Sequence, residues 1–398
     1  MKRLFLTHIL FFIAAFVWCM PPKPGSDFTH DGSLYCNVIE NTVYSADDGV
    51  LRILPRTNND VVLTPTPVSK TILVLLVKFS DYEFNSDLHG CTSSTVHNKE
   101  YYEKLLGGDS SFSMRKYYEV MSNGKLLLDF KVLGPYTATT YAFYGRDNAA
   151  GDDSNVSKLV DEILTKPVVQ SDIIAAGNNI DPCTVIFIHA GPGQEEYGNG
   201  EKVPEEYRNL IWSCRGALET PQKINDKYYS DYTIQPEYII GNGCEASIGV
   251  FCHEFGHVLG LPDLYDTIYA TAGVGNWSLM GAGSWGSDKS GNDPAPLMNW
   301  EKATLGWIPE TVIDVSATPQ QVNFKNANDA AELLRINLDA DKNQYLVFEG
   351  KKKASGPDKF VPEDGLLITQ IHEGVYKDRM RSNTINYGVS AVHAVSIM

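Results

Sequence analysis

The chain has 398 residues, of which 43% are hydrophobic, and its formal net charge is −16. This length allows two or more domains with a sizeable core, and the composition lacks the bias of disordered chains. The negative charge argues against nucleic acid or an anionic membrane surface as a partner.

Residues 1–19 have the pattern of a signal peptide. A basic start precedes an apolar run at 9–18, and about ten apolar residues are too few to span a bilayer. No other segment of the sequence predicts a membrane span. A cut after Cys19 satisfies the small-residue rule, and the bulky Trp18 leaves a lipid anchor on Cys19 as the weaker alternative. The sequence therefore predicts a secreted or extracytoplasmic protein.

Residues 20–69 form an N-terminal segment rich in Pro, Asp, Asn and Thr. The segments that follow predict a mixed, twisted sheet backed by helices, with the helix around residue 253 behind it. The run at 71–79 is β-rich and apolar, which indicates a buried strand, and residues 114–122 have helical periodicity. The predicted fold class is α+β. Its elements are the strands 71–79, 126–133 and 184–190 and the helices 114–122 and 160–164.

The sequence from 252 to 263, CHEFGHVLGLPD, contains a spacing suited to a metal. On a helix, His253 and His257 differ by about 40° and about 6 Å of rise, so both imidazoles can share one ion. Glu254 lies roughly 60° from His257, close enough to act on a water that the metal activates. A separate apolar face at helical spacing supplies the core, so the histidines are not needed to fill it.

The residues after the second histidine predict a third ligand. In a continued helix, Asp263 would lie about 240° round from His257 and out of reach of the ion. Gly260 can adopt the left-handed conformation that ends a helix, and Pro262 cannot extend one. The turn can swing Asp263 back toward the histidines. The alternative for Asp263 is a turn aspartate that caps the next residues.

Two neutral imidazoles and one carboxylate suit Zn²⁺ and leave a fourth position open, as catalytic zinc sites require. Glu254 could then act as general base toward water and as general acid toward the leaving amine. This chemistry hydrolyses peptide bonds without a covalent intermediate. The competing interpretation is a core helix with two hydrogen-bonded histidines, because short motifs recur by chance.

The extended pattern HExxHxxGxxD, followed by SLMGAGSW at 278–285, resembles the metzincin metallopeptidases and their methionine turn. Within them, these phrases and YYEVMSNGK at 117–125 are most similar to the immune inhibitor A family of secreted bacterial peptidases. The resemblance extends from about residue 70 to the end of the chain. It implies a metzincin-like catalytic domain in which His253, His257 and Asp263 bind zinc and Glu254 is the general base and acid.

The resemblance also implies that Met280 forms an apolar floor beneath the ligands in a methionine turn. A buried methionine near a glycine-rich turn can equally be a plain gap filler. Most metzincins have a third histidine where this chain has Asp263. In a thermolysin-like arrangement the third ligand would be a later glutamate, and Glu301 ranks second to Asp263 for that role.

The N-terminal segment at 20–69 resembles a propeptide. Such a segment can keep a secreted peptidase latent by occupying the open zinc position, with Cys36 as a thiolate or a nearby aspartate as a carboxylate. Cys36 is equally suited to a disulfide. Six cysteines remain after export, an even number compatible with disulfides in an oxidising compartment, and the sequence does not choose among the possible pairings. They are Cys36, Cys91, Cys183, Cys214, Cys244 and Cys252.

The catalytic domain is predicted at 70–307, and a β-rich region follows at 308–398. Short alternating runs predict its strands at 322–324, 334–338, 345–349 and 366–371. The apolar run at 389–398 has no closing turn after it, so we expect the chain to be incomplete and to end within a strand.

The resulting hypothesis is a secreted zinc endopeptidase that acts on proteins or peptides. One alternative is a catalytically silent protein that binds extracellular protein or glycan, which an intact Glu254 argues against. The other is a metal-dependent hydrolase of small amides or esters.

Two oxygen-rich loops at 147–153 and 288–293 suit Ca²⁺ less well than they suit solvated turns. Oxyanion stabilisation is undetermined among Tyr265, Tyr269 and Trp285, and the sequence does not predict the oligomeric state.

Overall fold

The computed structural model describes residues 18–19, 67–86, 94–110, 113–141, 144–145, 154–197, 210–313, 332–353, 356–389 and 392–398. The apolar part of the predicted signal peptide, most of the propeptide-like segment, the loop at 147–153 and the predicted strand at 322–324 lie outside these residues. Among the described residues, no helix is both long enough and apolar enough to cross a membrane.

A six-stranded mixed sheet forms the larger part of the fold, in the order β1-β5-β6-β4-β2-β3. β2, β3, β4 and β6 run parallel to one another, and β5 pairs antiparallel with β6 and with β1. The prediction of a mixed sheet in an α+β fold is confirmed. Its strands are β1 (Trp18–Cys19), β2 (Val68–Phe79), β3 (Leu126–Ala138), β4 (Ile180–Pro192), β5 (Cys214–Ile224) and β6 (Lys227–Tyr238).

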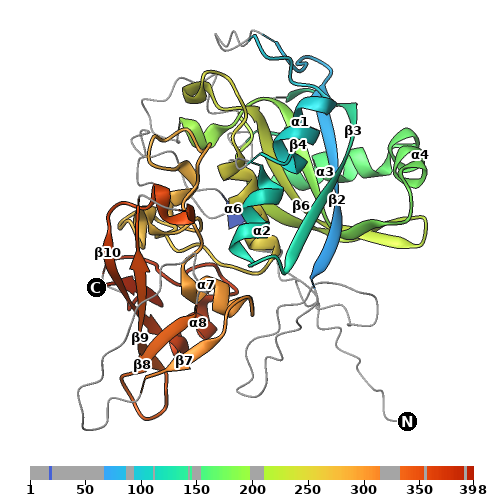
Figure 1. Ribbon diagram of the computed structural model, residues 1–398. Coiled ribbons are helices and arrows are strands. Elements are labelled where there is room, and N and C mark those ends of the chain that lie inside the picture. The colour runs from blue at the N-terminus through green and yellow to red at the C-terminus, as the bar shows by residue number, and fades with distance from the viewer. Residues whose placement is uncertain are drawn as a thin grey trace, which may run out of the picture.

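Helices cover both faces of this sheet (Figure 1), because its interior strand β2 is apolar on both sides. In β2, Ile72, Val74 and Leu76 pack with α1, α2 and α6. The alternate residues Leu73 and Leu75 pack with α3 and α4 on the other face. The α-helices are α1 (Lys99–Gly107), α2 (Met114–Met121), α3 (Ser154–Thr165), α4 (Pro167–Ala176), α6 (Ile248–Val258), α7 (Asn299–Thr304) and α8 (Glu373–Arg379).

The antiparallel hairpin of β5 and β6 is absent from the predicted elements. Two residues join its strands, Asn225 at φ 46° and Asp226 at φ 63°. Asparagine and aspartate tolerate positive φ, and a two-residue loop with both residues at positive φ is the hairpin turn that matches strand twist. The Asn-Asp pair directly before the tyrosine-rich run of β6 was the signal in the sequence.

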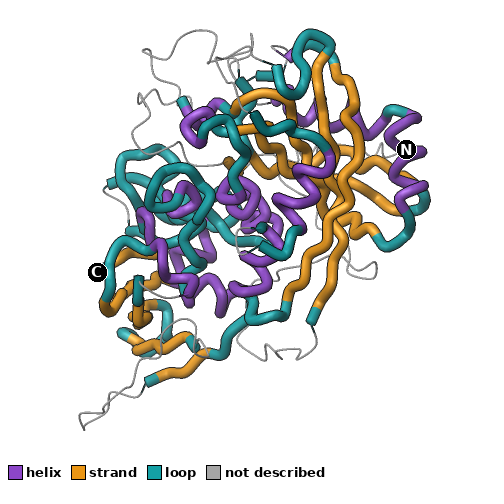
Figure 2. The backbone as a smooth tube through the Cα atoms, turned by 45° about the horizontal axis from the view of Figure 1, so that its top comes forward, coloured by secondary structure: helices purple, strands orange, loops and turns teal. Residues whose placement is uncertain are grey.

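The C-terminal residues form a second sheet, in the order β11-β10-β9-β8-β7. A group of helices lies between the two groups of strands (Figure 2), and one apolar core extends from the central sheet into the second one. The strands predicted at 334–338, 345–349 and 366–371 are confirmed, whereas among the described residues of the run at 389–398 only β11 is a strand. The strands are β7 (Glu310–Val312), β8 (Leu333–Asn337), β9 (Gln344–Lys351), β10 (Gly365–His372) and β11 (Val395–Ile397).

The described cysteines are not all paired. Cys244 is disulfide-bonded, but Cys183 and Cys252 are free thiols. Cys252 is fully buried on α6 among apolar side chains, which raises the pKa of its thiol.

Short 3-10 helices complete the described elements. They are η3 (Gln194–Glu196), η4 (Ile240–Asn242), η5 (Gly275–Trp277), η6 (Ala282–Trp285) and η7 (Gly356–Phe360).

Candidate metal centre

Helix α6 carries both histidines of the motif on one side and is buried along almost its whole length. The ring centroids of His253 and His257 are 4.8 Å apart and the rings are nearly perpendicular. Both imidazoles are buried, at 0% and 2% exposure. The helical spacing therefore places two ring nitrogens beside each other inside the protein.

The helix ends in a Schellman motif at Gly260. The Gly260 N–H donates to the His257 carbonyl at 2.9 Å, and the Leu261 N–H donates to the Gly256 carbonyl at 3.0 Å. Gly260 has φ 92°, where a side chain would be strained. This bend turns the chain back, so Asp263 lies beside the histidines and not a further half-turn along a helix.

Three acceptor atoms converge after this bend. Asp263 Oδ1 lies 3.1 Å from His253 Nε2 and 3.3 Å from His257 Nε2. In the described part of the chain, these three residues form the one cluster of His, Cys, Asp or Glu side chains spaced to hold a metal ion. The structure thus brings together the three residues that the sequence predicted as ligands.

Backbone carbonyls set the tautomer of each imidazole. His253 Nδ1 lies 2.9 Å from the Leu279 carbonyl, and His257 Nδ1 lies 2.8 Å from the Leu261 carbonyl. Because a carbonyl oxygen only accepts, each Nδ1 carries the proton and donates it, which leaves Nε2 as a lone pair in the neutral ring. Outer hydrogen bonds of this kind orient histidine ligands in metal sites.

The charge states of the cluster are those that a metal site needs. Burial lowers the pKa of His257, which keeps its imidazole neutral. Burial alone would raise the pKa of Asp263, but the adjacent His257 and His253 lower it to about 2. A neutral His257 imidazole therefore faces an ionised Asp263 carboxylate at neutral pH.

The loop at 278–281 contacts the histidine-bearing helix and the turn that follows it. Its Leu279 carbonyl orients His253, and its Met280 carbonyl accepts the Leu264 N–H at 2.8 Å, next to Asp263. Met280 is fully buried, and its Sδ lies 2.5 Å from the position that a Cβ on Gly256 would take. The glycine between the two histidines therefore leaves room for the thioether.

Glu301 does not lie with the histidines. Its carboxylate accepts the Ser278 hydroxyl at 2.9 and 2.7 Å and the Met298 N–H at 2.6 Å. Ser278 Oγ in turn accepts the Met280 N–H at 2.9 Å. Glu301 thus supports the loop at 278–281 from α7. The geometry gives no support to the thermolysin-like alternative, in which Glu301 would be the third ligand.

Burial raises the pKa of Glu301 to about 8. The unfolded chain would lose this proton near pH 4.5 while the folded protein keeps it, so this group's stabilising contribution falls as pH rises from 4.5 to 8. As pH rises from 5 to 8, we expect the melting temperature of Glu301→Gln, which mimics the protonated form, to fall by less than that of wild type. Melting curves at both pH values check this, and parallel losses in the two proteins would contradict it.

Tyrosines flank the cluster. Tyr265 stacks on His253 with ring centroids 6.4 Å apart, and on Tyr269 at 5.5 Å. Burial, with the charges of Asp263 and Glu254 nearby, raises the pKa of Tyr265, so its phenol stays protonated. Trp285 instead packs with two aliphatic side chains in a small apolar cluster. Of the three oxyanion candidates, Tyr265 therefore lies beside a predicted ligand, and Tyr269 stacks on Tyr265.

Helix α2 packs against α6 through the tyrosines of the 117–125 phrase. The Tyr118 hydroxyl donates to the Cys252 carbonyl at 2.5 Å, and its ring meets Phe255 edge-on at 5.2 Å. Tyr117 donates to the Ala295 carbonyl at 2.8 Å. These contacts hold the metal-site helix against the central sheet.

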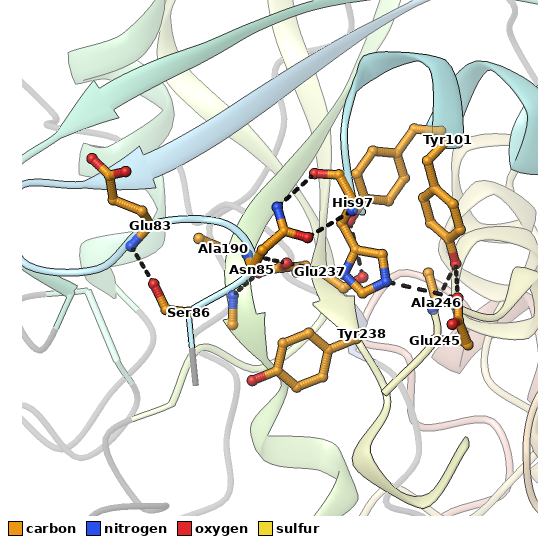
Figure 3. Close-up of polar contacts among 12 residues, drawn as sticks. Glu83, Asn85, Ser86, His97, Tyr101, Ala190, Glu237, Tyr238, Glu245 and Ala246 are labelled. Carbon is orange, nitrogen blue, oxygen red and sulfur yellow. Dashed lines mark hydrogen bonds and ion pairs between the residues drawn. The ribbon is translucent and has the colours of Figure 1, made fainter. Parts of the chain in front are cut away.

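A buried polar network fixes the chain where it enters α6 (Figure 3). Glu237, at the end of β6, accepts the Asn85 N–H at 2.7 Å and His97 Nδ1 at 3.0 Å. The Tyr101 hydroxyl accepts the N–H of Ala246, two residues before the helix, at 3.0 Å. No local pattern in the sequence indicated His97 or Glu237, because their partners are distant along the chain.

The loop at 288–293 forms an ordinary turn. Asp288 Oδ1 accepts both the N–H and the hydroxyl of Ser290, at 3.0 and 2.8 Å. These are the local hydrogen bonds of an aspartate turn, which agrees with the solvated-turn interpretation.

Known proteins match the part of the chain that contains these residues. The profile of the immune inhibitor A peptidase M6 catalytic domain matches residues 61–308. Immune inhibitor A of Bacillus thuringiensis subsp. alesti is 34% identical over 271 residues, 56% of this chain and 37% of that protein. Pre-pro-metalloprotease PrtV of Vibrio cholerae serotype O1, in strain M66-2, is 28% identical over 351 residues, 74% of this chain and 36% of that protein.

PrtV of the Vibrio cholerae strain ATCC 39315 / El Tor Inaba N16961 matches to the same extent. The chain spans a little over a third of the length of these relatives. The family profile covers more than half of the chain and includes the whole cluster on and after α6. The chain therefore belongs to the immune inhibitor A family of M6 metallopeptidases.

Proposed function

We propose that this chain is a secreted zinc endopeptidase in which His253, His257 and Asp263 bind the metal. The convergence of two unprotonated imidazole nitrogens and one carboxylate oxygen carries the proposal. His253 Nε2 and Asp263 Oδ1 are buried and have no hydrogen-bond donor among the described residues. Buried acceptors that face one another need a cation, and a set of two nitrogens and one oxygen suits zinc better than calcium or magnesium.

We propose Glu254 as the general base and acid. It follows His253 on α6, is fully buried, and lies near enough to Tyr265 to raise the pKa of that phenol. Zinc, when bound, supplies a Lewis acid that polarises the scissile carbonyl and acidifies the attacking water. Glu254 takes a proton from that water and delivers it to the leaving amine, so no covalent intermediate is needed.

Met280 is proposed as the apolar floor of the site. The substitution Gly256→Ala tests it, because the new Cβ would lie 2.5 Å from the buried Sδ. Alanine gains about 1 kcal/mol of helix propensity, whereas overpacking costs about 1–3 kcal/mol. We expect a net loss of thermal stability and weaker zinc binding, measured by melting and zinc titration. An unchanged melting temperature and zinc affinity would remove Met280 from the site.

Secretion and latency are proposed from the N-terminal sequence. The pattern at 1–19 supports a signal peptide, and the composition at 20–69 supports a propeptide-like segment ahead of the catalytic domain at 70–307. The name of the Vibrio relatives, pre-pro-metalloprotease, agrees with this organisation. The proposed substrates are proteins and peptides outside the cytoplasm.

Metal removal tests the proposal on the full chain. We expect about one zinc per chain, loss of cleavage of a denatured protein substrate after dialysis against a chelator, and recovery with zinc but not with magnesium. Zinc at a thousand times its dissociation constant should also stabilise the fold by about 4 kcal/mol. Cleavage that persists without metal would remove the proposed function, and zinc binding without any cleavage would favour the binding-protein alternative or latency.

A further inference from the structure

Asp263 is held by a residue from the C-terminal region, 120 residues further along the chain. The Asp263 N–H donates to Asn383 Oδ1 at 2.8 Å, and Asn383 Nδ2 donates to Asp263 Oδ2. Both side chains are buried, at 1% and 7% exposure. One amide side chain therefore binds both the backbone and the carboxylate of the same residue.

This pairing assigns different roles to the two carboxylate oxygens. Oδ2 is occupied by the Asn383 amide, whereas Oδ1 points to Nε2 of both histidines. With Oδ2 fixed, the carboxylate cannot rotate its free oxygen away from the histidines. The amide also leaves the charge of Oδ1 available, because it donates only to the other oxygen.

The backbone at position 383 restricts which side chain can do this. Asn383 follows α8 with φ 52°, in the left-handed region that asparagine tolerates better than most residues. A second asparagine supports the same loop, since Asn386 Nδ2 donates to the Leu264 carbonyl at 2.8 Å and its Oδ1 accepts the Val395 N–H at 3.0 Å. The turn that carries Asp263 is thus bound to the segment before β11.

We propose that Asn383 is the positioning residue for the third metal ligand, so the C-terminal β-rich region completes the metal site. This inference rests on the proposed zinc function. The matched family profile ends at residue 308, and Asn383 lies beyond it. Residues 308–398 are then part of the working site and not an accessory domain.

Zinc affinity of the full chain tests the proposal, by competition with a chromophoric chelator. Asn383→Asp keeps the size, the tolerance of positive φ and the acceptor for the Asp263 N–H, but replaces the donor with a second negative oxygen. We expect zinc binding to weaken about 10- to 100-fold, as for other outer-shell changes. Asn386→Asp is the matched control, since it also loses one donor and keeps one backbone acceptor.

The control should lose thermal stability but weaken zinc binding much less than Asn383→Asp, because Asn386 holds the backbone at Leu264 and not the Asp263 carboxylate. Equal weakening in both variants, or none in Asn383→Asp, would overturn the proposal. Asn383→Gly, which also tolerates the left-handed backbone, replaces Asn383→Asp if that variant does not fold. Failure of the proposed function would appear in wild type, which would then bind no zinc or cleave nothing.

A reciprocal exchange gives a second measurement. In Asp263→Asn, an amide oxygen that faces the metal leaves the amide nitrogen facing Asn383 Nδ2, two donors without an acceptor between them. Combining it with Asn383→Asp restores a donor opposite an acceptor. The double variant should bind zinc more tightly than Asp263→Asn alone. Additive losses would show that the two side chains do not act on each other.

Discussion

Glu254→Gln should reduce kcat/KM for a protein substrate by about 10²- to 10⁴-fold, the range over which a positioned general base acts. This corresponds to roughly 3–5 kcal/mol of transition-state stabilisation. Glutamine has nearly the same size and fills the same buried position, but it cannot accept the proton of the attacking water. Zinc content should not change, because Glu254 is not one of the three converging ligands.

The measurement is a comparison of zinc content and initial cleavage rates in wild type and Glu254→Gln, purified as full chains. Retained zinc with lost cleavage separates the base from the ligands. Equal cleavage rates in the two proteins would remove Glu254 from its assigned role. If neither protein cleaves although both hold zinc, the catalytic site is blocked or silent, and the comparison must be repeated after limited proteolysis of residues 20–69.

Local patterns were sufficient to predict the parts of the molecule that neighbouring residues determine. The buried strand at 71–79 follows from its continuous apolar run, and helix α2 from its periodicity and its Asn-Gly end. The bend after His257 follows from Gly260 and Pro262, since one residue ends a helix and the other cannot continue it. Placing Asp263 near the histidines needed only that bend.

The parts that could not be predicted depend on contacts between distant residues. Asn383 lies in a short turn after α8 and has no motif around it, so only the fold brings it to Asp263. Glu237 and His97 are 140 residues apart, and only the fold brings the residue before α1 to the end of β6. The pairing of the cysteines stayed open for a similar reason, because an even count cannot show that Cys252 is a free thiol enclosed by core side chains.

The C-terminal region shows what a strand pattern predicts and what it leaves open. Alternating runs correctly predicted the strands β8, β9 and β10 within the β-rich region at 308–398. In the structure, residues of these strands share one core with α6 and α7, and α8 packs there as well. A strand pattern identifies an element but not the surface it packs against, which is why the link to the metal site was missed.

Asp263→Ala should have the second largest effect, because it removes the only negative charge among the three converging ligands. We expect zinc affinity to fall by more than the about 10- to 100-fold that outer-shell changes cause, and cleavage to fall with it. The loss also leaves the Asn383 amide buried without its carboxylate partner. Saturating zinc should restore only part of the cleavage, since two imidazoles alone do not fix the metal's position.

Glu301→Gln is the control that separates the two candidate third ligands. Glu301 is equally buried, yet its oxygens accept hydrogen bonds from Ser278 and Met298 and lie apart from the histidines. The zinc affinity of Glu301→Gln at neutral pH should match that of wild type, because burial already keeps the Glu301 carboxyl of wild type largely protonated at that pH. If Glu301→Gln lost zinc and Asp263→Ala kept it, the ligand assignment would be reversed, and the convergence after Gly260 would be only a turn.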